Sequence, residues 1–273
     1  MELNGCHVIA ARSTHAVQAA SFVLELPAHI SSDIAQAALN YYENSHSLKE
    51  LFPIKTEAQG ISINLDDQSV NVNQSTGLQG LTLQRVTDDG SLELSFAIQN
   101  NQMVYTCHKY TGWKEVFEKA LSILSEFMEF VCPVPGVSVV GIQYVDEFFI
   151  TGNKEGFRSD IIFSTDNTRL PVSLLSASGF WHNHSGWFSP TPDKTQGQVL
   201  NNLNVSVYPQ QPDRHAVQII TAHRLMLALP ISDKGRVLET LPTTFEMLHS
   251  TNKALFREVL NEETLRSINL LPK

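Results

Sequence analysis

The chain has 273 residues, which is enough for one large domain or two smaller ones. Hydrophobic residues make up 42% of the chain and charged residues 17%, a balance that supplies a packed core and excludes a disordered protein. The net charge is −9 and no cluster of lysine and arginine interrupts it, which argues against a broad nucleic-acid-binding surface.

The first third of the chain predicts one strand, a broken helix and another strand. The apolar run Ala20–Pro27 reads as a buried strand that ends at its proline. A capping residue at Ser31, Ser32 or Asp33 then opens a helix that breaks at Asn44–Ser45 before a second short helical turn. Gly60–Asp67 alternates apolar and polar residues and predicts a strand, with a polar loop after it.

The middle of the chain predicts a β-meander followed by a long helix. Residues 78–110 contain two turn signals, Asp88-Asp89-Gly90 and Asn100-Asn101, between three apolar runs. Residues 112–131 place large apolar side chains at steps of three and four, so we expect an amphipathic helix that lies on the meander. The segment Cys132–Gly136, with two prolines, is the strongest candidate for a junction between domains.

The remaining segments predict strands and then helices. Val137–Ile150 is rich in β-branched and aromatic residues and predicts a strand. A further strand is expected at Arg158–Ser164, and three more at 179–190, 199–210 and 215–230. Two helices close the chain: residues 243–260, and a second helix capped by Asn261.

Together these elements predict the α+β class with two similar halves, residues 1–132 and 133–273. Each half is expected to be an antiparallel β-meander gripping a long amphipathic helix, with the second half packed tightly on the first. The likeness between the halves is one of pattern, without a residue-level repeat, so a duplication is a hypothesis.

The three cysteines, Cys6, Cys107 and Cys132, lie far apart and form no C-x-x-C pair. We therefore expect free thiols rather than a disulfide framework or a thiolate zinc site. No stretch has the pattern of a signal peptide or of a membrane-spanning helix, so we expect a cytoplasmic protein that does not act at a membrane.

Three segments together resemble a known family. They are "YTGWKEVF" at the entrance of the long helix, "VVGIQYVDEFF" in the strand after the prolines, and "FEMLHSTNKALFREVLNEETLRSI" at the end. The chain is similar there to bacterial and archaeal proteins of about this length that are sporadically distributed and have no assigned function. That family's strand usually has Arg at the position of Gln143 and Asn at that of Asp146. The patchy distribution implies a defence or toxin–antitoxin gene, which is an association by family and not a property of these residues.

The segment with the most candidate functional residues is "GFWHNHSGWFSP", from Gly179 to Pro190. His182 and His184 are two residues apart, so on a strand they face the same side and can approach one metal ion. His215 and His223 share a parity on a later strand and are candidates for further ligands. No carboxylate follows at a suitable spacing, and the alternative is a solvated strand face.

Aromatic and polar residues on two strands are candidates for an interface or a pocket. Trp181 and Trp187 have the opposite parity from the histidines and belong either to the core or to a protein interface. Tyr144 and Asp146 share a strand face and, with Gln143, form either a hydrogen-bonded network or the lining of a pocket. Asp146 and Glu147 are neighbours on a strand and point to opposite faces, which makes them a poor acid–base pair.

The chain lacks phosphate-loop, dinucleotide and nucleophile-elbow motifs, and we identify no catalytic residue and no cofactor. The sequence therefore favours a non-enzymatic protein that binds another protein, as the antitoxin or accessory subunit of a two-gene prokaryotic defence module. The partner would be encoded nearby, and a homodimer is left open. Two alternatives remain: a metal-dependent hydrolase or nuclease that uses His182 and His184, and a small-molecule binder with a cavity between sheet and helix.

Overall fold

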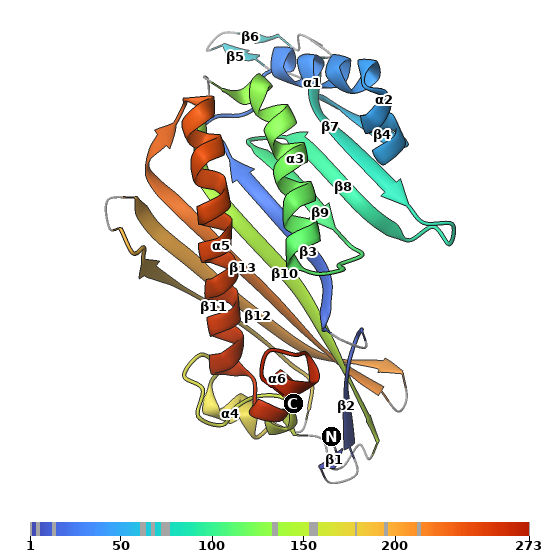
Figure 1. Ribbon diagram of the computed structural model, residues 1–273, viewed down its shortest axis with the longest axis vertical. Coiled ribbons are helices and arrows are strands. Elements are labelled where there is room, and N and C mark those ends of the chain that lie inside the picture. The colour runs from blue at the N-terminus through green and yellow to red at the C-terminus, as the bar shows by residue number, and fades with distance from the viewer. Residues whose placement is uncertain are drawn as a thin grey trace. The chain divides into compact units, whose positions relative to one another are not determined.

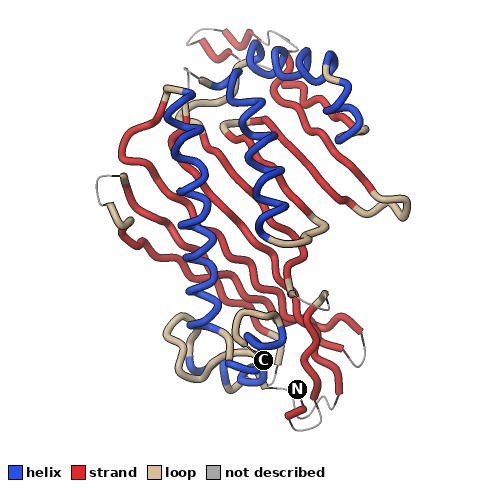
Figure 2. The backbone as a smooth tube through the Cα atoms, viewed as in Figure 1, coloured by secondary structure: helices blue, strands red, loops and turns tan. Residues whose placement is uncertain are grey.

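The computed structural model describes most of the chain. It covers residues 2–3, 6–12, 15–60, 64–66, 69–71, 77–132, 136–152, 158–177, 179–193, 196–211 and 214–272. In these residues the protein is α+β, with a large antiparallel sheet and six α-helices (Figures 1 and 2). The predicted α+β class is confirmed.

The chain divides into two compact units that are interleaved along the sequence. Unit 1 contains Met1–Ala20, Gly141–Met226 and Thr243–Lys273, and unit 2 contains Ser21–Val140 and Leu227–Pro242. The sequence instead suggested two consecutive halves with one boundary after residue 132. Three strands and one helix pass from one unit into the other: β3 (Val17–Glu25), β10 (Val137–Gly152), β13 (Arg214–Ile231) and α5 (Lys234–Val259).

Unit 1 is built on long antiparallel strands. The order is β11-β12-β13-β10, with β11 (Trp181–Pro190) at the edge and β12 (Gly197–Gln211) next to it. The short strand β2 (Cys6–Ala10) pairs with the end of β10 and with β1 (Glu2–Leu3). The three strands predicted between residues 179 and 230 are confirmed as β11, β12 and β13.

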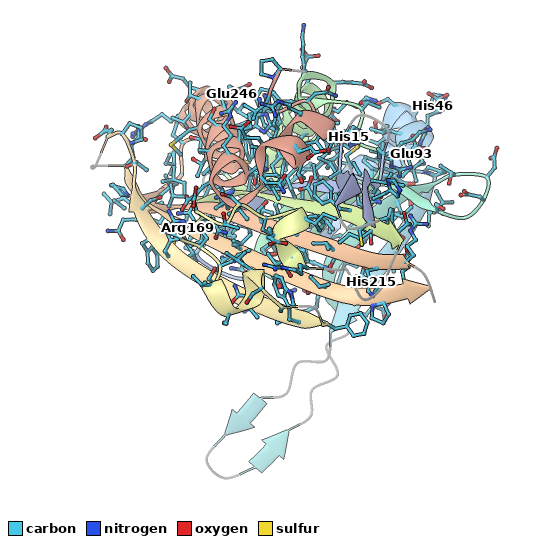
Figure 3. All side chains as sticks on the ribbon, turned by 90° about the horizontal axis from the view of Figure 1, so that it is seen from below. His15, His46, Glu93, Arg169, His215 and Glu246 are labelled. Carbon is cyan, nitrogen blue, oxygen red and sulfur yellow. The ribbon has the colours of Figure 1, made fainter. Side chains whose placement is uncertain are left out.

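One face of the unit 1 strands is covered by α5, which lies across them in Figures 1 and 3. This helix starts nine residues before the predicted Thr243 and contains Pro242. The last helix, α6 (Glu262–Ser267), is capped as predicted, since the Asn261 side chain accepts from Thr264 N at 2.9 Å. A short helix, α4 (Val172–Leu175), lies between β10 and β11 in the chain.

The strand predicted at Arg158–Ser164 is wrong. The segment forms a 3₁₀ turn, η2 (Ser159–Ile161), and three consecutive residues, Ile161, Ile162 and Phe163, are buried. A strand with one buried face alternates, so a run of adjacent buried side chains suits a turn enclosed on several sides. The Asn261 amide donates to the carbonyls of Asp160 and Ile161 at 3.1 and 2.9 Å and so pins the turn to the end of α5.

Unit 2 contains the predicted meander, with the strand order β3-β9-β8-β7-β4. Both predicted turns are confirmed, since Gly90 and Asn100 have φ angles of +82° and +55°. The strand expected at Gly60–Asp67 falls partly outside the described residues, which show β5 (Asn64–Asp66) paired with β6 (Ser69–Asn71). The meander strands are β4 (Ile54–Gly60), β7 (Gly77–Val86), β8 (Leu92–Gln99) and β9 (Gln102–Cys107).

The helix predicted at residues 112–131 is α3 (Trp113–Val131), and it packs on the meander as expected. The rings of Phe127 of α3 and Phe96 of β8 are in tilted contact, with centroids 4.4 Å apart, and Trp113 and Phe117 stack with Phe22. Seven apolar residues of α3 are buried, which accounts for the stripe seen in the sequence.

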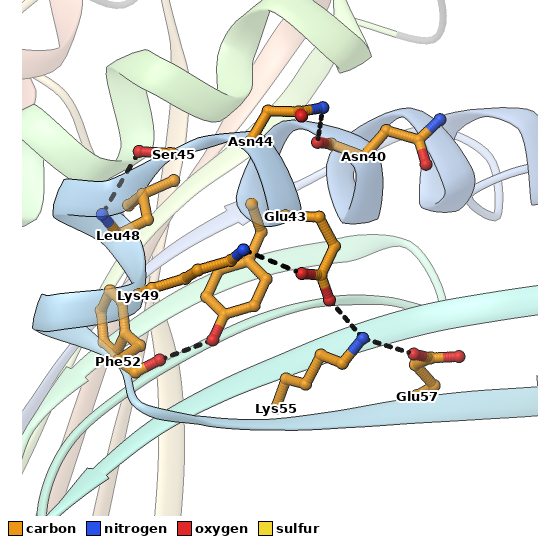
Figure 4. Close-up of polar contacts among 10 residues, drawn as sticks. Asn40, Glu43, Asn44, Ser45, Leu48, Lys49, Phe52, Lys55 and Glu57 are labelled. Carbon is orange, nitrogen blue, oxygen red and sulfur yellow. Dashed lines mark hydrogen bonds and ion pairs between the residues drawn. The ribbon is translucent and has the colours of Figure 1, made fainter.

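The predicted broken helix is α1 (Ser32–Asn44) followed by α2 (His46–Leu51). The break occurs where the Ser45 side chain accepts from Leu48 N at 3.3 Å and so starts the second helix. Figure 4 shows Glu43 of α1 bridged by Lys49 and Lys55, which tie the helix pair to β4.

The three cysteines are free, with Cys6 and Cys107 buried and Cys132 half-buried, as predicted. No helix in the described part of the chain is long and apolar enough to cross a membrane.

Candidate functional site

The segment singled out in the sequence is the edge strand β11. It pairs with β12 over ten residues without a shift in register, from Trp181 opposite Val207 to Pro190 opposite Gln198. Within the described residues, no strand pairs with its other side. The strand contains no Lys, Arg, Asp or Glu.

The two faces of β11 differ, as the sequence predicted. Its burial alternates strictly, with the even-numbered residues exposed and the odd-numbered ones half-buried. His182 and His184 lie on the exposed face, and the Nδ1 atom of His182 is 3.0 Å from Ser206 Oγ. Phe188 is on the same face with 60% of its surface exposed.

Trp181 and Trp187 lie on the inner face and pack against the buried core of unit 1. The Trp181 indole N–H donates to Ser159 Oγ at 2.8 Å, and its ring contacts Phe163. The Arg169 guanidinium (labelled in Figure 3) lies 4.1 Å from the centre of the Trp187 ring. Both tryptophans therefore anchor β11 on the loop that precedes it.

Between the tryptophans, the inner face of β11 is polar. Asn183 Nδ2 and Ser185 Oγ are shielded from solvent, and neither atom has a hydrogen-bond partner among the described residues. Buried polar atoms without partners are uncommon and cost free energy, so this stretch is incomplete as it stands.

A buried polar network joins β11 to helix α5. The Asn201 amide N–H donates to Trp187 O at 3.4 Å and to Ser189 Oγ at 2.9 Å, both on β11. Asn201 Oδ1 is 2.8 Å from His223 Nδ1 on β13, and His223 Nε2 is 3.2 Å from Asn252 Oδ1 on α5.

His223 is fully buried, and burial lowers its pKa to about 4 although the contact with Asn252 favours the protonated ring. His223 therefore stays neutral at pH 7 and serves as a hydrogen-bonded bridge within the core. It lies on the inner face of the sheet, whereas His182 and His184 are on the exposed face, and β12 separates β11 from β13. The structure thus does not bring His223 to the histidine pair.

The candidate residues on β10 also fall on two faces. Tyr144 and Asp146 are buried together, as their parity predicted, while Gln143 is half-buried on the other face. Tyr144 OH is 2.7 Å from His249 Nδ1 of α5. Burial lowers the pKa of His249 to about 4, with a smaller contribution from Lys253.

Asp146 is the most perturbed group of this face. It is 3% exposed, and its Oδ2 atom has no hydrogen-bond partner in the described part of the chain. Burial raises the pKa of its carboxyl to about 8, so the group is protonated at neutral pH. Two strands, β12 and β13, separate it from β11, so the β10 and β11 candidates do not form one site.

No group of three or more His, Cys, Asp or Glu side chains among the described residues is placed to hold a metal ion. Unit 2 has an open polar depression of about 570 Å³. It is lined by Pro53, Arg85, Val86, Thr87, Asp88, Asp89, Glu93 and Lys109.

A scan against models of known protein families finds no match, and neither does a search of curated protein sequences. Sequence reasoning missed the Asn201–His223–Asn252 network, because its members come from three distant segments. The one available signal was the occurrence of Asn201 and His223 at inner-face positions of strands that are otherwise apolar there.

Proposed function

We propose that this chain is a non-enzymatic protein-binding protein that docks a partner by strand addition at β11. The observation that supports this most directly is the open side of β11, a ten-residue regular strand without a charged residue. Pairing there would satisfy the backbone N–H and C=O groups that the edge presents.

Edge strands are usually protected against such pairing. Lysine side chains, inward-pointing charges, prolines and bulges are the common devices. In β11 the register is unbroken, the only proline is the last residue, and both tryptophans fix the strand on its inner side. A rigid, unprotected edge reduces the ordering cost that a partner must overcome.

The family resemblance suggests which partner to look for. A sporadically distributed prokaryotic family fits an antitoxin or accessory subunit of a two-gene defence module, whose partner is encoded beside it. This part of the proposal comes from the resemblance alone.

The test is capture of the partner from the native host by wild-type protein and by two variants. His184→Lys places a charge at the middle of the exposed edge and leaves the inner face intact. Met226→Lys, at an exposed position of β13, is the matched control. We expect His184→Lys to lose the partner and Met226→Lys to keep it, with unchanged circular dichroism for both.

Hydrogen exchange on the purified complex provides the second readout. The outward-facing amides of β11 should exchange at least tenfold more slowly in the complex than in the free chain. Undiminished capture by His184→Lys, with protection confined to another segment, would contradict the proposal.

A further inference from the structure

We infer that the strand added to β11 is β11 of a second copy of this chain, paired antiparallel about a two-fold axis at His184. This inference rests on the proposed function, because it concerns the same edge, and it makes a second copy of the chain, in place of a neighbouring gene product, the occupant of that edge. The argument comes from the residues that this register places opposite one another.

The hydrogen bonds to β12 determine which residues face the open edge. The Asn201 amide reaches Trp187 O from the β12 side, so Trp187 and the other odd-numbered residues direct their backbone groups toward β12. Pro190, which has no N–H to donate, is one of the even-numbered residues, whose backbone groups point away from β12. The even-numbered residues, His184 among them, therefore present their N–H and C=O groups to the open side.

In an antiparallel pair, residues that lie opposite one another place their side chains on the same face of the sheet. A two-fold axis perpendicular to the sheet meets this condition only when one residue lies opposite the same residue of the second copy. Centring the axis on His184 pairs residues whose numbers add to 368. Asn183 then lies opposite Ser185 of the second copy, and Trp181 lies opposite Trp187.

In this register Asn183 and Ser185 of the two copies lie opposite each other, and a rotation of both side chains toward the added strand would let them form hydrogen bonds. Asn183 Nδ2 is a donor and Ser185 Oγ is an acceptor, and each lacks a partner among the described residues. The axis brings the two together twice, once on each side. Because odd-numbered residues form the closer, non-hydrogen-bonded pairs of the new ladder, their side chains are within reach.

On the exposed face, Phe188, with 60% of its surface exposed, lies opposite residue 180 in this register, and the Phe180 ring contacts His215 of β13. His182 lies opposite Gly186, and the Asn202 side chain occupies the space beside that glycine. Centring on Ser185 instead would pair Asn183 with Trp187 and would leave its amide unmatched.

Charge favours this contact between identical chains. Each copy carries −9, so most surfaces of two copies repel each other, whereas β11 has no charged residue. The three hydrogen-bonded pairs that lie within β11, from residue 182 to residue 186, would form about six hydrogen bonds, which is within the range of a typical protein interface.

Cysteine cross-linking tests both the dimer and the register, with Cys132→Ser as the background because Cys6 and Cys107 are buried. Under mild oxidation, Asn183→Cys mixed with Ser185→Cys should form a covalent dimer, since those residues face one another. Each variant alone should not, whereas the exposed His184→Cys should cross-link with itself. Self-cross-linking of Ser185→Cys or of Asn183→Cys alone would overturn the register.

The mass in solution tests the dimer independently of these substitutions. Light scattering of the wild-type chain should give twice the chain mass, and His184→Lys should raise the dissociation constant at least tenfold. A wild-type monomer at all accessible concentrations, with no cross-link from His184→Cys, would overturn the inference. If the wild-type chain is a monomer but captures a different protein that His184→Lys does not capture, the proposed function stands without the dimer. If no captured protein depends on His184, both the dimer and the proposed function fail.

Discussion

Asp146 makes the stability of unit 1 depend on pH in a way that a single substitution removes. Its carboxyl has a pKa of about 8 in the folded chain, because it is buried without a partner for Oδ2 among the described residues, against 3.8 when unperturbed. Between these values the folded state holds a proton that the unfolded state has released. The free energy of unfolding therefore falls as pH rises, by about 1.4 kcal/mol per pH unit within that window.

Asp146→Asn keeps the size of the side chain and removes the titration. From about pH 5 to about pH 7, the wild-type chain should lose about 2–3 kcal/mol relative to Asp146→Asn, which corresponds to a shift in Tm of roughly 5–10 °C. Urea and thermal unfolding, followed by tryptophan fluorescence, measure this difference. A Trp113→Phe background restricts the signal to Trp181 and Trp187, which report on unit 1.

The comparison between the two proteins at each pH cancels the contributions of the other titrating groups. Asp166→Asn, at an exposed position of unit 1, is the matched control and should change stability by the same small amount at both pH values. If Asp146→Asn and the wild type differ by the same free energy at both pH values, the carboxyl is not held protonated by burial, and the reasoning is refuted.

Three further predictions concern the same unit. His223→Gln should reduce the loss of stability that occurs as pH falls from about 6.5 to about 4, because the buried neutral ring binds its proton only on unfolding; denaturation at both pH values checks this. Asn261→Ala should destabilise the chain by about 1–3 kcal/mol, since the side chain caps α6 and also satisfies two carbonyls of η2; Ser250→Ala, at an exposed position of α5, is a control in thermal unfolding. Arg169→Leu should speed hydrogen exchange in β11, because the guanidinium that covers Trp187 and pairs with Glu258 is lost, whereas Arg158→Leu should not.

Most elements could be predicted from the sequence because their signals are local. The two faces of β11 follow from the period of two, and the positive φ angles at Gly90 and Asn100 follow from residue types that tolerate them. The cap at Asn261 is likewise set by neighbours within one turn. These predictions hold because each conformation is decided by interactions between residues that are close together in the sequence.

The failures involve interactions between distant segments. The helix predicted to begin at Thr243 in fact continues upstream through Pro242, and Thr240 Oγ1 there bonds to the carbonyl of Arg236 at 2.9 Å. The turn at Ser159–Ile161 is held by Asn261, about a hundred residues away, so its sequence alone reads as a strand. Nothing local predicts that Asn201 and His223 will meet, because strand pairing brings them together.

The buried network and the open edge belong to one arrangement. Asn201 is bonded to Trp187 and Ser189 of β11 and, through His223, contacts Asn252 of α5. An apolar core would anchor β11 through non-directional contacts alone, whereas these hydrogen bonds fix its register and the direction of its backbone groups. An edge strand whose outward N–H and C=O groups are fixed in advance loses less entropy when a second strand pairs with it. Burying these polar side chains under α5 costs free energy, and this cost is offset because the network holds β11 ready for pairing at the edge.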